Sequence, residues 1–333
     1  MRGVVARDGK CVVVDVEEPV CTPDDLIIEV KATAVNRLDT LQRKGKAKPP
    51  PGASEVLGLE VAGVVAAVGA NAEAFAVGDE VCALVSGGAF AERVAVDARA
   101  VLRKPKNLSF REAAAVPETW LTAFQLLFLV GALAPGESVL LHAAASGVGC
   151  AATQLAAKHG GRVVATASSE AKCAVATRLG AVGAVAAPRV GGATAQWLEG
   201  AVAANGGKGF DVILDCVASS YASQNVEALA VDGRWVLYSV LTGPKLDDSV
   251  AATFLGKLLA KRASLLATTL RARPIAYKAK LVAAFDAATN FQAGFGGYEV
   301  VVDRVFTGLD AAQDAHDYME SNANVGKIVV DLE

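Results

Sequence analysis

The sequence lacks the cysteine pairs and cysteine–histidine spacings on which disulfide frameworks and structural zinc sites depend. No C-x-x-C or C-x-x-H motif occurs. The six cysteines are scattered singly, at Cys11, Cys21, Cys82, Cys150, Cys173 and Cys216. We therefore expect reduced thiols, and neither a disulfide framework nor a structural zinc site.

Long apolar runs and a basic charge excess are also missing. The longest apolar run, residues 121–134, falls short of the roughly 20 residues that a membrane-spanning helix needs, and the first residues show no secretory h-region. The net charge is -3 and the pI is near 5.8, which leaves no footprint for nucleic acid or an anionic membrane. The sequence predicts a soluble cytoplasmic enzyme with a small-molecule substrate.

Two different patterns divide the chain. Residues 1 to about 115 contain short apolar segments separated by turns, such as "DLIIEVKATAV", which predict a β-rich barrel or sandwich. From Leu121 onward, strand-like segments such as "FDVILDCV" alternate with helical segments such as "CAATQLAAKHG". That alternation is typical of βαβ units around a buried parallel sheet, so the fold class is α/β.

A run of small residues separates one such strand from the helix that follows it. The segment "HAAASGVG", residues 142–149, has the strand–turn–helix order that a dinucleotide pyrophosphate needs, because helix N-terminal amides attract phosphate. It predicts cofactor contacts at Ser146, Gly147, Val148 and Gly149. The alternative is an ordinary tight turn between a strand and a helix.

The end of the next strand lacks the acidic residue that would bind an adenosine ribose diol. Ala167, Ser168 and Ser169 occupy that position, and Lys172 follows one helical turn later. Hydroxyls, helix N-terminal amides and an ammonium group suit a 2′-phosphate, so these residues favour NADPH over NADH. The alternative is that Ser169 only caps the helix and Lys172 belongs to a solvated face.

Several motifs along the chain resemble one family. They include "AVNRLDTLQRKG", "PETWLTAFQLLFLVG", "LAVDGRWVLYS" and "ESNANVGKIVV". Through them the chain resembles the medium-chain dehydrogenases/reductases, and among these the zinc-free quinone oxidoreductases close to the p53-inducible quinone oxidoreductase. The resemblance implies a discontinuous GroES-like catalytic domain at residues 1–119 and 286–333, a Rossmann NADPH-binding domain with a doubly wound parallel sheet at 120–285, and a homodimer.

The resemblance also bears on metal binding. Zinc-dependent relatives carry a cysteine and a histidine at the positions that match Asn36 and Leu59, and neither of these residues can supply a thiolate or imidazole ligand. We therefore expect no metal. No chemistry is assigned to the three histidines, His142, His159 and His316.

Further site residues follow from matching positions in the family. Asn36 is expected to be the catalytic, substrate-binding polar group that faces the substrate oxygen; the alternative is an asparagine that stabilises a turn. Thr122 is expected to lie near the nicotinamide; the alternative is a hydroxyl bonded back to its own helical turn.

Two positions depart from the family pattern. Ala47 stands in the loop "GKAKPPPG" where the family commonly has a tyrosine near the nicotinamide, and Ala187 replaces another tyrosine, which leaves Arg189 to supply charge to a phosphate. The missing phenol at Ala47 predicts a substrate-binding pocket that accepts bulky fused-ring quinones.

Together these features predict NADPH-dependent reduction of quinones, in particular bulky ortho-quinones, by hydride transfer without zinc. One alternative is an NADPH-dependent alkenal or enone reductase, which needs the same hydride geometry and a proton donor. The other is a nucleotide-binding protein without catalytic activity.

Overall fold

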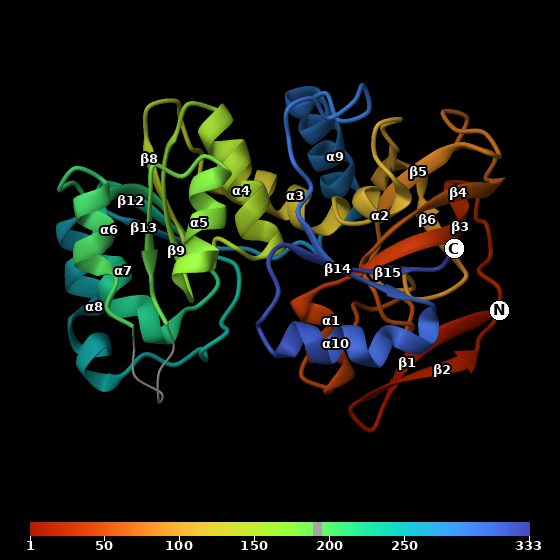
Figure 1. Cartoon of the computed structure of the whole chain (residues 1–333), viewed down its shortest axis with the longest axis horizontal. Helices are drawn as coiled ribbons and strands as arrows, with labels where there is room; N and C mark the ends of the chain where they lie inside the picture. Colours follow the sequence, from red (N-terminus) through yellow and green to blue (C-terminus); the bar gives the residue numbers. More distant parts are fainter. Residues whose placement is uncertain (189–194) are drawn as a thin grey trace. The chain divides into compact units, whose positions relative to one another are not determined.

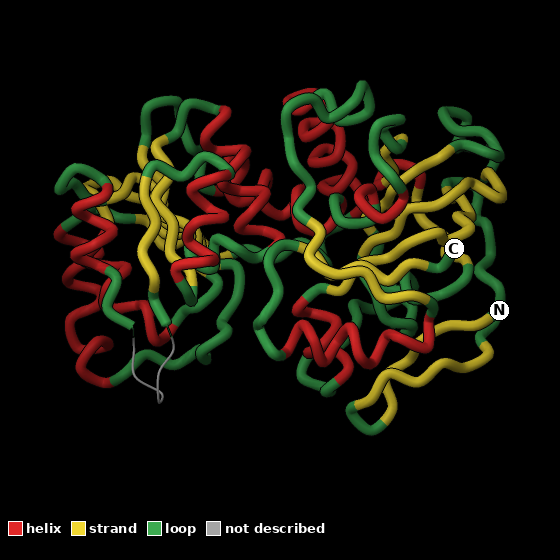
Figure 2. The backbone as a smooth tube through the Cα atoms, viewed as in Figure 1, coloured by secondary structure: helices red, strands yellow, loops and turns green. Residues whose placement is uncertain are grey.

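A computed structural model describes residues 1–188 and 195–333. These residues form two compact units, one of Met1–Leu121 with Leu270–Glu333 and one of Thr122–Thr269. Strands predominate in the first unit, whereas strands and helices alternate in the second (Figure 2). The predicted α/β fold, with a β-rich domain and a Rossmann-like parallel sheet, is confirmed.

The first unit is built on a seven-stranded sheet of order β14-β15-β3-β4-β5-β7, with β6 also paired to β3. All its strand pairs are antiparallel except β14 with β15. A separate hairpin joins β1 and β2. The strands are β1 Arg2–Arg7, β2 Lys10–Asp15, β3 Asp25–Val35, β4 Glu60–Val68, β5 Glu80–Leu84, β6 Arg93–Asp97, β7 Val101–Arg103, β14 Val302–Thr307 and β15 Lys327–Asp331.

Helices of the first unit lie at the ends of this sheet and beside it (Figure 1). Helix α1 contacts α10, and α10 contacts β15. The helices are α1 Arg37–Arg43, α2 Phe110–Ala113, α9 Ile275–Thr289 and α10 Ala312–Glu320. Helix α3, Pro117–Phe124, begins in this unit and ends in the second.

The second unit contains a six-stranded parallel sheet of order β10-β9-β8-β11-β12-β13. Numbered from β8, that is the order 3-2-1-4-5-6 of dinucleotide-binding folds, whose ligands bind where the strand order reverses. The reversal lies between β8 and β11. The strands are β8 Ser138–Leu141, β9 Arg162–Ala167, β10 Gly183–Ala186, β11 Phe210–Asp215, β12 Leu229–Leu237 and β13 Ser264–Ala267.

Helices cover both faces of this sheet (Figure 1). Helices α4 and α5 contact each other, and α7 contacts both α6 and α8. The central strands are buried on both sides, which explains their nearly continuous apolar sequences. The helices are α4 Gly147–Lys158, α5 Glu170–Arg178, α6 Leu198–Ala204, α7 Ala222–Ala228 and α8 Asp248–Ala260; a π-helical segment, Gln125–Val130, continues α3.

The second unit is shorter than the expected nucleotide domain of residues 120–285. It ends at Thr269, and α9 belongs to the first unit. The reason is aromatic packing, since Phe285 of α9 packs against Phe291 and Phe295 of the same unit. All three side chains are essentially inaccessible to solvent.

Within the described parts of the chain, no helix combines the length and the apolar character needed to cross a membrane.

Candidate functional site

The turn after β8 places the predicted phosphate-binding residues at a helix N-terminus. Ser146 is the N-cap of α4, and its hydroxyl accepts a hydrogen bond from the Gly149 amide at 3.1 Å. Gly147, Val148 and Gly149 form the first turn of α4. Because first-turn amides have no acceptor within their own helix, this end of α4 carries partial positive charge that suits a phosphate.

Gly149 is fixed by the close approach of helix and turn. A Cβ atom built on Gly149 would lie 2.5 Å from the Ala143 carbonyl oxygen and from the Ala144 backbone. Ala143 has a φ of 53°, in the left-handed region, which turns the chain sharply before the helix. A larger residue at 149 would therefore force the loop away from α4.

A buried polar network lies where the strand order reverses. The His142 ring bonds Thr166 Oγ1 at 2.9 Å and Asn225 Oδ1 at 2.7 Å. Asn225 Nδ2 in turn donates to Asp215 Oδ2 at 3.0 Å. The Asp215 carboxylate, at the end of β11, also accepts hydrogen bonds from the indole of Trp235 and from the amides of residues 217 and 218. All five hydrogen-bonded side chains are buried.

These contacts define the state of His142. Asn225 Oδ1 can only accept, so His142 Nε2 carries the proton, and Nδ1 accepts from the Thr166 hydroxyl. Burial lowers the pKa of His142 despite the nearby Asp215 charge. The neutral ring therefore joins the ends of β8 and β9 to Asn225 of α7, which in turn bonds Asp215 at the end of β11.

Three polar residues expected to bind the adenosine phosphate follow the end of β9. Ser168 and Ser169 are exposed, and Lys172 is partly buried. Ser169 is the N-cap of α5, and its hydroxyl accepts from the Lys172 amide at 3.3 Å. The capping role is thus present, and the Ser168 side chain beside it is exposed.

The structure describes only part of the expected phosphate environment. Ala187 is buried, and its amide donates to the Ala167 carbonyl at 2.7 Å, so it extends the pairing of β10 with β9. It packs in the core cluster that includes Trp197. Arg189, the other residue expected to supply charge, lies outside the described residues.

In the first unit, Asn36 belongs to a buried cluster of charged and polar groups. It precedes α1, and its amide Nδ2 donates to Glu60 Oε1 at 2.8 Å and to the Ala34 carbonyl at 3.3 Å. Its Oδ1 accepts from Lys327 Nζ at 2.7 Å. Both polar atoms of the amide are therefore occupied, and the longest of its contacts is the one to Ala34.

Glu60 and Lys327 form the saturated centre of this cluster. Lys327 Nζ donates to Glu60 Oε1, to Asn36 Oδ1 and to the Val35 carbonyl, which uses all three of its protons. Glu60 Oε2 accepts from the Glu118 amide at 2.8 Å. A buried ion pair needs such additional bonds to offset the cost of removing two charges from water.

Two further carboxyls beside this centre are shifted toward their protonated forms. Burial raises the pKa of Asp39 to about 7, partly opposed by a hydrogen bond from the Asn36 amide. Burial raises the pKa of Glu118 to about 8, and the Glu60 charge adds to that rise. Asp39 Oδ1 and Glu118 Oε2 are buried and have no hydrogen-bond partner in the described structure.

The loop before α9 adds cations to the same unit. Arg271 is buried, and its Nε donates to the Ser86 carbonyl at 2.8 Å. Lys278 Nζ donates to Ser86 Oγ at 2.7 Å and to the Arg271 carbonyl at 2.9 Å. These bonds hold the backbone and the inner nitrogen of Arg271 in place.

Sequence reasoning missed most of this cluster and, in the second unit, the role of Asp215. Glu60 and Asp215 each interrupt an apolar strand, "VLGLEVAG" and "DVILDCV", and a charge in such a run is a signal that could have been used. Lys327, Arg271 and Glu118 carry no comparable signal, because their partners lie far away in the sequence.

Two other predicted residues take no part in the contacts of this cluster. Thr122 lies on α3 and is half-buried, and its hydroxyl has no partner among the residues that the structure describes. Ala47 is half-buried in the turn after α1, where its amide donates to the Leu41 carbonyl at 3.3 Å. Its methyl group adds no polar function.

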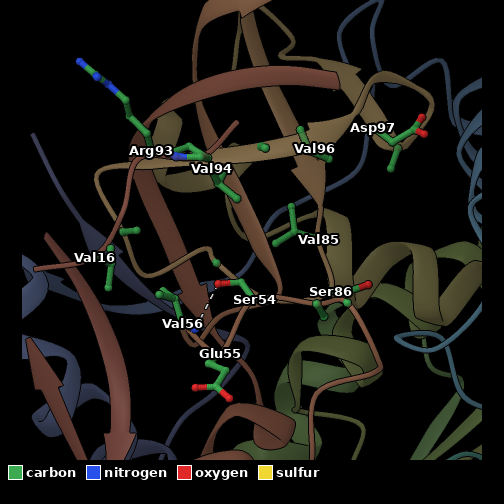
Figure 3. Close-up of a pocket in the computed structure, with 18 of the residues that line it drawn as sticks. Val16, Ser54, Glu55, Val56, Val85, Ser86, Arg93, Val94, Val96 and Asp97 are labelled. Carbon is green, nitrogen blue, oxygen red and sulfur yellow. Dashed lines mark hydrogen bonds between the residues drawn. The ribbon is translucent and has the colours of Figure 1, made fainter. Parts of the chain in front are cut away.

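A cavity of about 910 Å³ opens on the first unit, but none of the predicted site residues lines it (Figure 3). Its wall includes Val56, Val85, Val94 and Val96 (Figure 3). Ser86, which also holds Arg271, and Lys278 are among its lining residues. The cavity is therefore separate from the contacts of Asn36.

The metal-ligand positions of zinc-dependent relatives hold no ligand set. Asn36 is bonded as described above, and Leu59 is completely buried. Among the described residues, no group of three or more histidine, cysteine, aspartate or glutamate side chains could hold a metal ion.

Comparisons with known proteins agree with this architecture. A family model described as zinc-binding dehydrogenase matches residues 147–287, and one described as alcohol dehydrogenase GroES-like domain matches residues 22–106. The solved structure of an NAD-dependent alcohol dehydrogenase is 30% identical with a TM-score of 0.84, over 100% of both chains.

Two further solved structures carry different activities in their names. The quinone oxidoreductase from Thermus thermophilus, also solved with NADPH, is 29% identical with a TM-score of 0.79, over 100% of both chains. The CurK enoyl reductase is 26% identical with a TM-score of 0.82, over 100% of this chain and 99% of that chain.

Curated relatives are much longer proteins. A phenolphthiocerol/phthiocerol polyketide synthase of Mycobacterium tuberculosis is 33% identical over 314 residues, 93% of this chain and 14% of the synthase. A highly reducing polyketide synthase of Aspergillus terreus is 37% identical over 218 residues, 64% of this chain and 8% of the synthase. The chain thus spans a small fraction of these relatives.

Proposed function

Because the chain belongs to the medium-chain dehydrogenase/reductase superfamily of oxidoreductases, we propose that it reduces quinones with NADPH by hydride transfer without zinc. One observation carries this proposal. The positions of a catalytic zinc site hold Asn36, which is bonded to Glu60 and Lys327, and the apolar Leu59. Without a Lewis acid an alcohol or ketone is a poor substrate, whereas a quinone accepts a hydride to give a hydroquinone anion that its own ring stabilises.

The second unit would hold NADPH. When bound, NADPH supplies the hydride. The end of β9 has two exposed serines and no carboxylate, which suits a 2′-phosphate, and the matched Thermus thermophilus structure was solved with NADPH. The residues that we assign to the cofactor are Thr122, beside the nicotinamide, with Ser146, Gly147, Val148 and Gly149 at the pyrophosphate and Ser168, Ser169 and Lys172 at the adenosine phosphate.

The first unit would receive the acceptor, with Asn36 as a direct contact. Its Nδ2 proton now shared with the Ala34 carbonyl at 3.3 Å is the donor most easily given to a substrate oxygen. Lys327 and Glu60 hold the amide in orientation. The small Ala47 side chain leaves room for fused rings, so we assign bulky ortho-quinones as preferred acceptors.

A second candidate function is reduction of activated alkenes such as alkenals or enones. The similarity to the CurK enoyl reductase and to polyketide synthases favours it. That reaction needs a proton donor at the α-carbon, and the raised pKa of Glu118, caused by burial, suits such a donor. A nucleotide-binding protein without activity is the remaining alternative.

We also propose a homodimer formed through the second unit. Strand β13 lies at the edge of the six-stranded sheet, where its outer hydrogen-bonding groups are available to a second copy. Leu255 and Leu259 of the preceding helix α8 are 77% and 80% exposed, and Leu265 on β13 is 42% exposed. A dimer would bury these side chains, and Leu259→Asp should shift the sedimentation coefficient toward that of a monomer.

The test is NADPH oxidation by 9,10-phenanthrenequinone after exhaustive chelation. We expect turnover that chelation leaves unchanged and that added Zn²⁺ does not raise. Activity that disappears with the chelator and returns with one equivalent of Zn²⁺ would contradict the metal-independent mechanism. Absence of turnover with quinones and alkenals alike would leave only the binding function.

A further inference from the structure

Arg271 is a buried cation whose outer nitrogens have no partner. Its side chain is 7% exposed, and Nη1 and Nη2 are both inaccessible and without a hydrogen bond in the described structure. A buried guanidinium in that condition is costly unless something accepts from it, because five donors must be satisfied and only Nε is. Unpaired buried donors of this kind call for a ligand or for ordered water.

The guanidinium is also held rigidly, so its free edge has a fixed direction. Ser86 accepts from Arg271 Nε through its carbonyl, and its hydroxyl donates to the Arg271 carbonyl at 3.1 Å. Lys278 donates to the same Arg271 carbonyl. Since Nε is bonded to Ser86, the two Nη groups are the part of the guanidinium left for a ligand, as a planar two-pronged donor.

Unpaired acceptors lie near this donor but do not touch it. Burial lowers the pKa of Arg271, and the carboxyls of Asp39 and Glu118 partly offset that effect, so their charges are close enough to act on the guanidinium. None of the three forms a hydrogen bond with another, although Asp39 Oδ1 and Glu118 Oε2 are buried and unpaired. Oxygen atoms of a ligand or of ordered water would satisfy these groups by accepting from Arg271 and receiving protons from the acids.

The charges of the cluster indicate whether it favours a negatively or a positively charged ligand. Burial holds Asp39 and Glu118 toward their neutral forms, so neither carboxyl fully offsets the charge of the Arg271 guanidinium, whose Nη groups have no hydrogen-bond partner. An anion, or an oxygen that becomes anionic during reaction, is therefore favoured there.

We propose that Arg271 is a substrate-binding residue whose two Nη groups bind the two adjacent oxygens of an ortho-quinone, or of its hydroquinone anion, in a bidentate manner. This inference rests on the proposed function. After the quinone has gained a hydride it is a hydroquinone monoanion, and Arg271 stabilises its oxygens. One proton from the Glu118 carboxylic acid then gives the neutral hydroquinone, and solvent reprotonates Glu118.

The first experiment measures binding without turnover. Absorbance titrations of the full chain with ionised 4-nitrocatechol, which has two adjacent oxygens, and with 4-nitrophenol, which has one, should give dissociation constants that favour the catechol by about tenfold or more, the size of one specific pocket contact. Arg271→Lys keeps the positive charge but loses the pair of Nη donors, and should bring the ratio of the two dissociation constants close to one. Arg271→Met should weaken binding of both anions.

Arg273→Met is the matched control, because Arg273 lies in the same loop and stacks on Tyr277 instead. It should keep the wild-type preference. Circular dichroism melting of each variant identifies those that fold; if Arg271→Met does not fold, Arg271→Lys decides. An unchanged catechol preference in folded Arg271→Lys, or its loss in Arg273→Met, overturns the assignment.

Turnover separates this inference from the proposed function. In the wild type, kcat/KM for 9,10-phenanthrenequinone should exceed that for 1,4-naphthoquinone, and Arg271→Lys should lower the ratio by about tenfold. Wild-type enzyme that reduces both quinones, with a ratio that Arg271→Lys leaves unchanged, refutes the role of Arg271 alone. Wild-type enzyme that reduces neither refutes the proposed function, and the nitrocatechol titration still tests the anion site.

Discussion

Two buried polar regions in the described part of this protein differ in how completely their hydrogen bonds are satisfied. Around His142 in the second unit, each polar side-chain atom of Asn225 and Asp215 has a partner. Around Arg271 in the first unit, atoms of Asp39, Glu118 and Arg271 itself have none. A saturated network holds strands together and has nothing left to bind, whereas an unsaturated one is suited to a ligand. The difference separates structural polar groups from those that we assign to the acceptor.

The largest change in stability is expected when the saturated network around His142 loses Asp215. Asp215→Ala would leave the Asn225 amide, the Trp235 indole and two backbone amides without their acceptor. The free energy of unfolding should fall by about 3 kcal/mol or more, because each buried donor left unpaired costs about 1 to 3 kcal/mol. Urea denaturation followed by circular dichroism measures the change.

Asp211→Ala is the control for that variant. Asp211 lies on the same strand and accepts only from Ser138, in a partly exposed position. The Asp211→Ala change should lower the free energy of unfolding clearly less than Asp215→Ala does. Equal losses of unfolding free energy would show that the His142 network contributes no more to stability than the Asp211–Ser138 contact does.

The second effect concerns the pH dependence of stability and comes from the unsaturated cluster. The charged groups near Glu118 are Glu60, Asp39, Lys327, Lys278 and Arg271, and burial is the largest cause of its raised pKa. A carboxyl whose folded pKa is about 8, against 4.5 for the ordinary group, stabilises the fold below the unfolded pKa. That stability is lost as the pH rises through the folded value.

Stability should therefore decline from about pH 5 to about pH 8, with Glu118 contributing on the order of 1 kcal/mol per pH unit. Thermal melts of wild type and Glu118→Gln across this range measure it, and the variant should show the flatter profile. Glu73→Gln, at an exposed position, should keep the wild-type slope. Parallel profiles for wild type and Glu118→Gln would contradict a protonated Glu118.

A third prediction sharpens the assignment of the cofactor to the second unit. Lys172→Ala should raise the dissociation constant of NADPH by an amount equivalent to about 1 to 3 kcal/mol, the usual size of a charge-assisted contact, and leave that of NADH nearly unchanged. Fluorescence titration measures both constants. The exposed Lys208→Ala on the same unit is the control. Equal wild-type constants for the two cofactors would overturn the NADPH assignment.

The smallest effect is expected at Ala47. Ala47→Tyr should shift kcat/KM toward small acceptors by roughly tenfold, about 1.4 kcal/mol, as one pocket contact does. The measured quantity is the ratio of kcat/KM for benzoquinone to that for phenanthrenequinone. If the ratio is unchanged, Ala47 does not line the acceptor site.

Local patterns made the fold and the nucleotide loop predictable. Strand and helix periods indicated the α/β class, and the small residues at 146–149 follow a strand directly, so their position at the start of α4 depends only on neighbours in the chain. The expected domain boundary near residue 285 stays a prediction; by contacts within the chain α9 groups with the first unit, where Phe285 packs with aromatic residues that follow it. Periodicity alone does not show which unit a helix joins.

The buried cluster around Asn36, Glu60 and Lys327 could not be predicted from the sequence in the same way. Asn36, Glu60 and Lys327 are separated by up to 291 residues and meet because β15 pairs with β3 and β3 with β4. Asn36 was expected to face the substrate, and the structure shows that most of its hydrogen bonds serve this cluster. Arg271 has no motif around it, and its significance comes only from the partners that it lacks.

The central claim is that the unsaturated cluster of the first unit receives a quinone, and one measurement tests it most directly. It compares kcat/KM of the chelated wild-type protein, at saturating NADPH, for 9,10-phenanthrenequinone and for trans-2-nonenal. We predict that the quinone is favoured by about tenfold or more, since its anion needs no carbon-bound proton and engages both Nη groups of Arg271. A preference of the same size for the alkenal would contradict the account and identify an alkene reductase.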